Sequence, residues 1–343
     1  MLKILNKLKK NKIPLDEYIN LCLYKYRSSY YEKKKIFGPR GDFITAPYIS
    51  SIFGEILAIY IINYFLEKNI SNFTILEIGA GEGIMAKDII NTAMKFKRIR
   101  FTYNILEKSK RLKDIQKENL ENHKVHWINS LDKVNHKNLF IISNELFDAF
   151  PIKHLKKIKN NWYEKYVFYD FKLKKISTEY IEIKKETYKI FKLINKKINF
   201  IEYSPGIISF ISQITRLLIK NKHNCFLTFD YGYFEESFKN TLQGLKNHKK
   251  INIFSQPSEV DITYLVNFNL IEKIFNKKNN FNNIIMTQSE FLTRAGIIER
   301  CNQAKKNLNS ENEKIKLDMA VNRLIEPNQM GTLFKSLIVT NAI

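Results

Sequence analysis

Cysteine is scarce in this sequence, and its placement excludes some kinds of site. The 343 residues include three cysteines, Cys22, Cys225 and Cys301, which lie far apart and share no metal-ligand spacing. This usage indicates a reducing compartment and no zinc site, so no metal is expected. Long apolar runs are also lacking, since no stretch approaches the length of a transmembrane helix. The basic, amphipathic N-terminus lacks the features of a secretory signal and predicts either a weak mitochondrial presequence or the first helix of the domain.

Acidic residues are few compared with basic ones. Asp and Glu number 34 against 57 Lys and Arg, which gives a formal net charge of +23. Clustered Lys and Arg bind phosphate, but here the excess is spread as lysine among many Asn and Ile residues, as an A+T-rich genome produces. No specific nucleic acid is therefore expected as a partner, while acidic protein surfaces and membrane surfaces stay open. The hydrophobic fraction of 44% supports a packed core.

Residues 72–83, NFTILEIGAGEG, organise the rest of the chain. A short apolar run suits a strand buried on both faces of a parallel sheet, and Gly79, Gly81 and Gly83 follow before helical spacing resumes. Strand, glycine turn and helix in this order form a site for an adenosine-containing cofactor. A dinucleotide fingerprint requires G-x-G-x-x-G, whereas G-x-G-x-G preceded by Glu77 is the pattern of Rossmann-like S-adenosylmethionine methyltransferases. A purely structural glycine turn is the alternative.

A second strand is predicted at 101–106, and it ends in Glu107. Nucleotide-binding folds place an acid there to bind ribose hydroxyls. A carboxylate can accept two hydrogen bonds from a vicinal diol. The alternative is that Glu107 only begins the charged helix at 108–121, where acids near the N-terminus are favoured in any case.

The alternation of strands and helices predicts an α/β fold with a doubly wound, mostly parallel sheet. Further strands are expected at 125–128, 139–143, 225–229, 284–287 and 334–340, and helices at 49–66, 83–97, 206–220 and 302–324. A turn is expected at 230–232 and a loop-rich section at 233–262. Ligands bind beyond the carboxyl ends of such strands, where Gly79, Glu107, Asn144 and Glu145 all fall.

We expect two parts in the chain. Residues 1–70 would form a helical N-terminal cap, helical over 1–35 and followed by the Gly- and Pro-rich loop that contains GDF at 41–43. Residues 71–343 would form the methyltransferase domain, interrupted at about 152–186 by an antiparallel insertion with strands at 162–169 and 180–183.

Segments along nearly the whole chain resemble the MidA-like methyltransferases, whose mitochondrial members act as complex I assembly factors and methylate a protein arginine. The matching segments are GDFITAP (41–47), FGE (53–55), LEIGAGEG (76–83), LEKS (106–109) with Gln116, NELFDAFP (144–151), DYG (230–232), TL (241–242) with His248, DIT (261–263), TQSEFL (287–292), GI (296–297), and MG with FK (330–335). The segment before Asp261 reads Pro-Ser-Glu-Val where the family tends to have glycine, so the acceptor specificity of that loop stays open.

The resemblance implies a cofactor and residues that hold it. S-adenosylmethionine would be bound by Glu77, Gly79, Gly81, Gly83, Glu107 and Asn144, with Asp42 and Thr45 covering its methionine end. The NELFDAFP segment would lie near the methyl acceptor. The implied partner is a protein substrate such as a subunit of respiratory complex I, and a homodimer is open. The compartment would be the bacterial cytoplasm or, alternatively, the mitochondrial matrix.

Glu145 and Asp148 are the candidate catalytic residues. A guanidinium has a pKa above about 12 and delocalised lone pairs, so carboxylates that grip its fork would orient the attacking nitrogen and stabilise charge. Alternatively, Asp148 caps the following turn and Glu145 binds ribose or backbone. Two rival functions are a non-catalytic scaffold that binds a respiratory-complex subunit and a nucleic-acid methyltransferase, although residues 144–147 do not match the Asn/Asp-Pro-Pro-aromatic type of motif.

Overall fold

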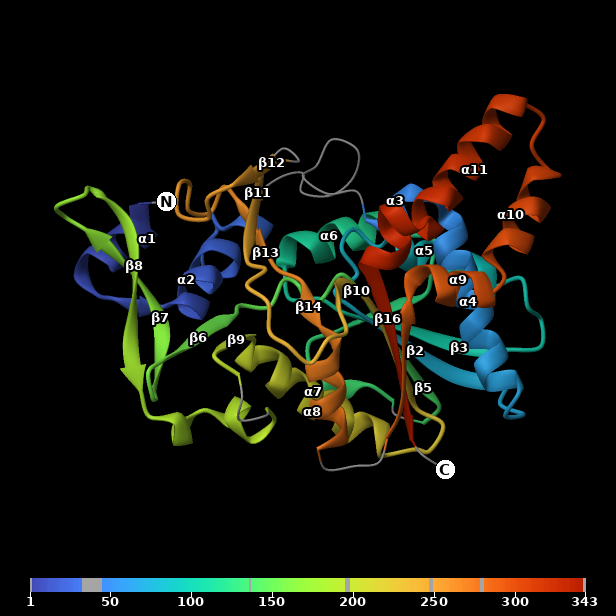
Figure 1. Ribbon diagram of the computed structural model, residues 1–343. Helices are drawn as coiled ribbons and strands as arrows, with labels where there is room; N and C mark the ends of the chain where they lie inside the picture. The colour runs from blue at the N-terminus through green and yellow to red at the C-terminus, as the bar shows by residue number, and fades with distance from the viewer. Residues whose placement is uncertain are drawn as a thin grey trace.

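The computed structural model describes residues 2–32, 45–135, 137–194, 198–246, 249–277 and 281–341. Its largest sheet follows the order β15-β16-β10-β5-β2-β3-β4, and β14 pairs with the end of β10 (Figure 1). In this sheet β16 runs antiparallel to both neighbours, and the other pairs are parallel. The predicted α/β fold with a doubly wound, mostly parallel sheet is confirmed. The strands are β2 (Asn72–Ile78), β3 (Arg100–Leu106), β4 (Val125–Ile128), β5 (Leu139–Asn144), β10 (Cys225–Tyr233), β14 (Val266–Asn267), β15 (Phe281–Thr287) and β16 (Phe334–Asn341).

Strand β2 is buried on both faces, as its apolar run predicts. Phe73 and Ile75 join one hydrophobic cluster, and Leu76 and Ile78 join another. Each of the four side chains is at most 4% exposed. Because side chains alternate between the faces of a strand, the two clusters lie on opposite sides of the sheet. The carboxyl end of β2 therefore brings the glycine turn to the middle of the sheet edge.

Helices cover both faces of this sheet. Buried side chains on the face of Phe73 come from α4, α5, α9, α10 and α11, and those on the other face come from α1, α2, α7 and α8. Among the described residues, no helix has both the length and the apolar character needed to cross a bilayer. The helices are α1 (Leu2–Lys10), α2 (Leu15–Asn20), α3 (Ala46–Ile49), α4 (Ser51–Leu66), α5 (Ile84–Ala93), α6 (Lys110–Asn119), α7 (Pro205–Leu218), α8 (Phe268–Asn276), α9 (Gln288–Arg294), α10 (Ile297–Lys305) and α11 (Glu311–Ile325).

A second, antiparallel sheet lies beside the first, at the left of Figure 1. The strands predicted at 162–169 and 180–183 are parts of its β7 and β8, but the sheet is wider than expected, because β1 and β9 also pair into it. Helices α1 and α2 pack against β7. The strands are β1 (Ile13–Pro14), β6 (Lys153–Ile158), β7 (Asn161–Asp170), β8 (Lys175–Ile183) and β9 (Phe200–Tyr203).

The turn expected at 230–232 was wrong, because these residues continue β10. Asp230 and Tyr231 pair with Lys335 and Phe334 of β16. Gly232 is needed there for a close approach rather than a turn, since a Cβ at this position would lie 2.1 Å from the carbonyl oxygen of Val266. The extension carries β10 past the carboxyl end of β5, while it stays paired with β16 and β14.

Three further expectations also need correction. The loop-rich section contains most of a small antiparallel sheet of β11 (Gln243–Lys246), β12 (Lys249–Ile251) and β13 (Asp261–Thr263). The polar helix expected at 302–324 is two helices, α10 and α11, because residues 306–310, which include Asn307, Asn309 and Ser310, interrupt it. The N-terminal helical region is interrupted by β1. Shorter helical turns are η1 (Leu21–Lys25), η2 (Tyr30–Glu32), η3 (Leu131–Lys133), η4 (Lys185–Thr187), η5 (Lys189–Lys192) and η6 (Pro327–Gly331).

Candidate active site

The glycine turn follows β2 directly and has left-handed backbone at each glycine. The φ angles of Gly79, Gly81 and Gly83 are 71°, 54° and 85°, a region that side chains disfavour. The N–H of Gly79 donates to the carbonyl oxygen of Leu106 at 3.0 Å, which ties the turn to the end of β3. Among the described residues, a Cβ built on Gly81 would meet no atom within 4 Å. The described part of the chain therefore leaves open space beside this central glycine.

Glu107 lies at the carboxyl end of β3 and is 9% exposed. Its Oε1 accepts hydrogen bonds from the backbone N–H groups of Lys108 at 2.8 Å and Ser109 at 2.9 Å. Among the described residues, its Oε2 has one long contact, 3.4 Å from the Nε2 of Gln116. Burial raises the pKa of the carboxyl group, while these donors oppose the rise. Since a carboxylate offers about four acceptor positions, Oε2 retains capacity for hydroxyl groups.

Gln116 joins the acid to the turn, although the sequence assigned it no role. Its side chain is fully buried, and its Nε2 donates to the carbonyl oxygen of Gly81 at 2.8 Å. Its Oε1 accepts from the indole N–H of Trp127 at 2.9 Å. In the sequence, Gln116 was recognisable only as the residue that accompanies the LEKS segment (106–109) in the family pattern.

Glu77 is placed differently from the other candidate cofactor residues. It lies inside β2, is 1% exposed, and its Oε2 accepts from the hydroxyl of Tyr103 at 2.6 Å. Burial raises its pKa to about 7. The structure therefore places this acid within the sheet, two residues before Gly79. The candidate Asp42 lies outside the described residues.

Thr45 precedes α3, whose first residues reach both the glycine turn and the end of β5. The backbone N–H of Ala46 donates to the carboxylate of Glu145. The hydroxyl of Tyr48 donates to the carboxylate of Glu82 in the turn. The segment that begins at Thr45 thus bonds both to the glycine turn and to Glu145 at the end of β5.

Asn144 and Glu145 end β5 and contact each other. The Nδ2 of Asn144 donates to Glu145 Oε1 at 3.2 Å, whereas the Oδ1 of Asn144 is buried without a partner among the described residues. Glu145 has a φ of 49°, a left-handed conformation that costs energy for a residue other than glycine. Burial and the charge of Asp148 raise its pKa to about 8. A strained backbone, an unpaired buried oxygen and a poorly solvated acid therefore occur together.

Asp148 and Asp230 are two further acids near Glu145. The Oδ2 of Asp230 accepts from the backbone N–H groups of Phe147 at 2.8 Å and of Asp148 at 3.2 Å. Asp230 thereby fixes the turn after β5, while Asp148 itself accepts from the backbone of Ala149. Burial and the charges of Asp148 and Glu145 raise the pKa of Asp230 well above its usual range. Sequence reasoning missed Asp230, which only its DYG segment signals.

The carboxyl group of Asp148 is held by hydroxyl groups. Its Oδ2 accepts from the Oγ1 of Thr263 at 3.1 Å, and the hydroxyl of Tyr231 also bonds to the carboxyl group. Burial raises its pKa to about 6. Within the described part of the chain, no ion pair of Lys, Arg or His forms with Glu145, Asp148 or Asp230, and no cluster suits a metal ion. The arrangement suits an organic cation.

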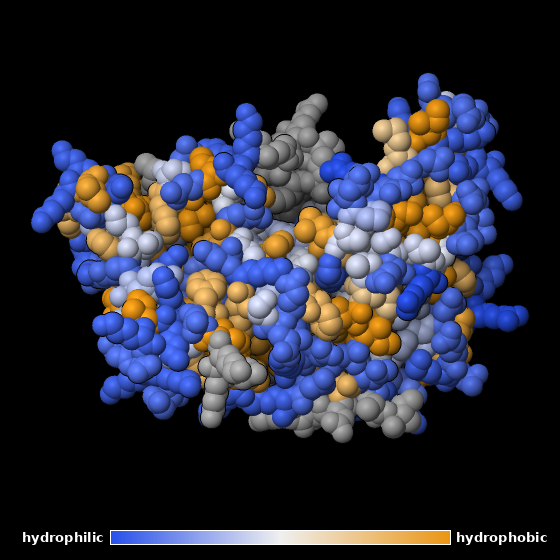
Figure 2. Space-filling model, in the orientation of Figure 1, coloured by the Kyte–Doolittle hydropathy of each residue, from blue (hydrophilic) through white to orange (hydrophobic). Residues whose placement is uncertain are grey.

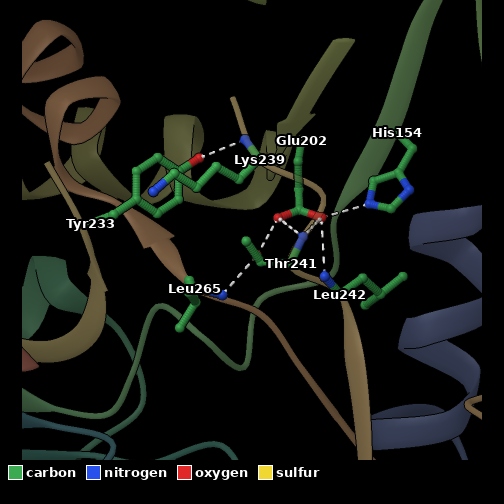
Figure 3. Close-up of polar contacts among 7 residues, drawn as sticks. All are labelled: His154, Glu202, Tyr233, Lys239, Thr241, Leu242 and Leu265. Carbon is green, nitrogen blue, oxygen red and sulfur yellow. Dashed lines mark hydrogen bonds and ion pairs between the residues drawn. The ribbon is translucent and has the colours of Figure 1, made fainter. Parts of the chain in front are cut away.

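Figure 3 shows a buried carboxylate, that of Glu202, which joins several segments of the chain. Glu202 of β9 accepts from the Nε2 of His154 at 2.7 Å, from the backbone N–H of Thr241 at 3.1 and 3.2 Å, and from that of Leu242 at 3.2 Å. The hydroxyl of Thr241 also donates to Glu202 and accepts from the N–H of Leu265 at 2.9 Å. The second sheet is thereby joined to the strand that carries Thr263.

The sheet order, the glycine turn and the acid after the second strand define a nucleotide-binding α/β fold of the Rossmann-like class. Residues 56–287 match the model of a family described as S-adenosyl-L-methionine-dependent methyltransferases, and the chain belongs to this family. The cofactor predicted from the glycine spacing, S-adenosylmethionine, and the predicted class of enzyme are confirmed by this membership.

Curated relatives match along nearly the whole chain. The chain is 26% identical over 351 residues to "Protein arginine methyltransferase NDUFAF7, mitochondrial" of Xenopus laevis, with 94% of this chain and 80% of the relative covered. It is 27% identical to the Drosophila melanogaster homologue, covering 95% and 80%, and 24% identical to the Homo sapiens protein, covering 94% and 78%.

Two solved structures share the fold. A Burkholderia thailandensis protein crystallised with S-adenosylhomocysteine superposes with a TM-score of 0.84 at 22% identity, covering 99% of this chain and 92% of that chain. A native crystal structure from the same organism gives a TM-score of 0.83 at 21% identity, with the same coverage. The likeness extends over both sheets, since almost all of this chain is covered.

Proposed function

We propose that this enzyme methylates an arginine side chain of a protein, with Glu145 and Asp148 holding the guanidinium group. The observation that carries the proposal is a pair of acids just after the carboxyl end of β5, the partly buried Glu145 and the buried Asp148, which lie beside Asp230 of β10 and have no cationic partner among the described residues. Buried charges are stable only when paired. The names of the relatives, protein arginine methyltransferases, support the same acceptor.

The residues at the edge of the sheet suit S-adenosylmethionine. The open space at Gly81, the spare acceptor capacity of Glu107 and the unpartnered Oδ1 of Asn144 are what a bound adenosine cofactor would fill and satisfy. We assign cofactor binding to Gly79, Gly81, Gly83, Glu107 and Asn144, with Glu77 supporting the turn from β2 and Asp42 and Thr45 covering the methionine end. The bound cofactor supplies a methyl group on a sulfonium, which makes the carbon electrophilic.

The acids have two tasks in this reaction. They orient one guanidinium nitrogen by gripping the opposite side of the fork, which lowers the entropic cost of attack. They also balance the positive charge until a proton leaves the nitrogen. A bound guanidinium lowers the pKa of a neighbouring carboxyl group, so Glu145 and Asp148 ionise when the acceptor enters. The carboxylate of Glu145 then accepts the proton, since its pKa of about 8 without acceptor makes it the stronger base of the two.

The relatives and the motifs support a choice of acceptor protein and of compartment. We propose a subunit of respiratory complex I as the substrate, because the matching segments resemble a family of complex I assembly factors. The named relatives are mitochondrial, which supports the mitochondrial matrix over the bacterial cytoplasm. Whether the chain forms a homodimer is tested by measuring the molar mass of the purified chain by light scattering.

The test compares two neutral variants with a matched control. Glu145→Gln and Asp148→Asn should each fold and keep S-adenosylmethionine binding by calorimetry, because the amides preserve shape. Both should lose methylation of arginine on a coexpressed complex I subunit, measured by mass spectrometry, because a neutral amide cannot balance the cation. Asp114→Asn, an exposed acid on α6, should retain full transfer.

Other outcomes separate the remaining functions. Full transfer by both variants would remove these acids from the mechanism. Transfer from labelled cofactor into nuclease-sensitive material of a host lysate would indicate a nucleic-acid methyltransferase. Cofactor binding without transfer to protein or nucleic acid, even by the unaltered chain, would support the scaffold.

A further inference from the structure

The turn between β7 and β8 exposes two large apolar side chains at its tip. Phe171 is 65% exposed and Leu173 is 60% exposed. The carboxylate of Asp170 accepts hydrogen bonds from the backbone N–H groups of Lys172 at 2.9 Å and Leu173 at 3.0 Å. These bonds fix the backbone of the turn, and the two apolar side chains stay largely exposed to solvent. The hairpin projects at the left edge of the molecule in Figure 1, away from the sheet that carries the active site.

Lysines surround the apolar tip. Lys172 lies between Phe171 and Leu173, and Lys174 and Lys175 follow. All three lysines are exposed, and none forms an ion pair with an acid in the described ranges. Apolar and cationic side chains therefore alternate over residues 171–174, and Lys175 adds a further positive charge.

Helix α1 extends the same surface. The Nζ of Lys9 lies 5.2 Å from the centre of the Tyr169 ring, and that ring meets the Phe171 ring edge to face at 5.3 Å. Lys10 is exposed beside Lys9 at the end of α1. Apolar and polar surface alternate at this end of the molecule in Figure 2. The tip and the end of α1 together form a surface with an aromatic centre and a surplus of positive charge, which we name the hairpin surface.

We propose that the hairpin surface docks on an anionic lipid bilayer. A projecting tip, unlike a concave groove, can place Phe171 and Leu173 in the boundary between headgroups and acyl chains. Lysine stems lie along apolar surroundings while their ammonium groups reach the headgroups, and basic side chains near a membrane are attracted by anionic lipids. The net charge of +23 strengthens this attraction over the whole chain. The proposal does not depend on the identity of the methyl acceptor.

Sedimentation with lipid vesicles tests the apolar part of this surface. The full chain should bind vesicles of phosphatidylcholine with phosphatidylserine. It should bind pure phosphatidylcholine vesicles at least about tenfold more weakly. Changing both Phe171→Ser and Leu173→Ser should weaken binding to the anionic vesicles about tenfold. Met319→Ser is the matched control, because Met319 is 66% exposed on α11, at the other end of the molecule. Its binding should be unchanged.

The charge is tested in the same assay. Lys172→Glu with Lys174→Glu should abolish most of the binding, whereas Lys95→Glu with Lys97→Glu, an equal charge change at exposed positions elsewhere, should have a much smaller effect. Thermal unfolding of each variant shows that it is folded. Equal binding to neutral vesicles, retention of binding by the tip variants, or equal losses in the controls would overturn the proposal. The proposal would also be overturned if the tip variants bound vesicles normally but lost binding to an acidic protein or to a nucleic acid.

Discussion

The side-chain amide of Gln116 donates a hydrogen bond of 2.8 Å to the carbonyl oxygen of Gly81. The same nitrogen lies 3.4 Å from Oε2 of Glu107. A fully buried residue of α6 therefore connects the glycine turn after β2 with the acid after β3. Because each partner restrains the others, the turn and the acid are held together as one hydrogen-bonded unit.

Gly81→Ala should weaken cofactor binding more than it weakens the fold. The left-handed backbone at this position costs an alanine about 1–2 kcal/mol, and the new methyl group projects into the open space that we assign to the cofactor. We expect affinity for S-adenosylmethionine to fall by at least about tenfold, or about 1.4 kcal/mol. Calorimetry of binding and thermal unfolding without cofactor measure the two effects.

Gly296→Ala is the control for the backbone cost. Gly296 is also left-handed, with a φ of 89°, and within the described ranges a Cβ there meets only a Glu299 oxygen at 3.6 Å. The two alanine variants should lose similar stability, but only Gly81→Ala should lose affinity. Equal affinity in both variants would mean that the space beside Gly81 is not part of the cofactor site.

The sequence predicts the cofactor half of the site well because its signals are local. These signals span 36 residues, from the apolar run of β2 through the glycines to Glu107. Each of them lies in or directly after a strand that the pattern of apolar residues predicts. The acceptor half depends on contacts that no local pattern contains. Asp230 bonds to the backbone of Phe147 and Asp148, more than 80 residues earlier, and Gly232 resembles a turn residue although it accommodates β14.

The stability of the protein should depend on pH through Glu145. Its pKa in the folded protein is about 8, because of burial and the charge of Asp148, and an unfolded glutamate has a pKa of about 4.3. A raised folded pKa means that the stabilisation is complete below the unfolded pKa and is lost as pH rises through about 8. Glu145→Gln should therefore exceed the unaltered protein in unfolding free energy at high pH, by on the order of 1–4 kcal/mol.

Urea unfolding at about pH 5 and about pH 9 measures this difference. The gain of Glu145→Gln should appear at the higher pH, while Asp114→Asn, an exposed acid, should show no pH-dependent gain. The same Gln variant should lose methyl transfer, so stability and activity change in opposite directions, as expected where a site stores electrostatic strain. A gain that is equal at both pH values would contradict the ionisation of Glu145 as its cause.

The last prediction concerns His154, whose ring is 1% exposed. Its Nε2 bonds to Glu202, and its Nδ1 is buried without a partner among the described residues, which assigns the neutral ring with its proton on Nε2. Burial lowers its pKa, so its contribution to stability is present at neutral pH and lost as pH falls through the folded pKa. His154→Leu removes a donor from a buried carboxylate and should cost about 1–3 kcal/mol.

Two other variants distinguish the hydrogen bond from the shape of the side chain. His154→Gln can still donate from its amide nitrogen, so it should recover much of the stability at neutral pH and lose the decline at low pH. His126→Leu, at an exposed position of β4, should change the unfolding free energy by less than about 0.5 kcal/mol. Because Glu202 anchors Thr241, and Thr241 holds the N–H of Leu265 two residues after Thr263 (Figure 3), hydrogen exchange should quicken at 241–246 and 261–265 in the Leu variant alone. Equal instability of the Gln and Leu variants would show that packing of the imidazole, rather than its hydrogen bond to Glu202, supports the strand beside Asp148.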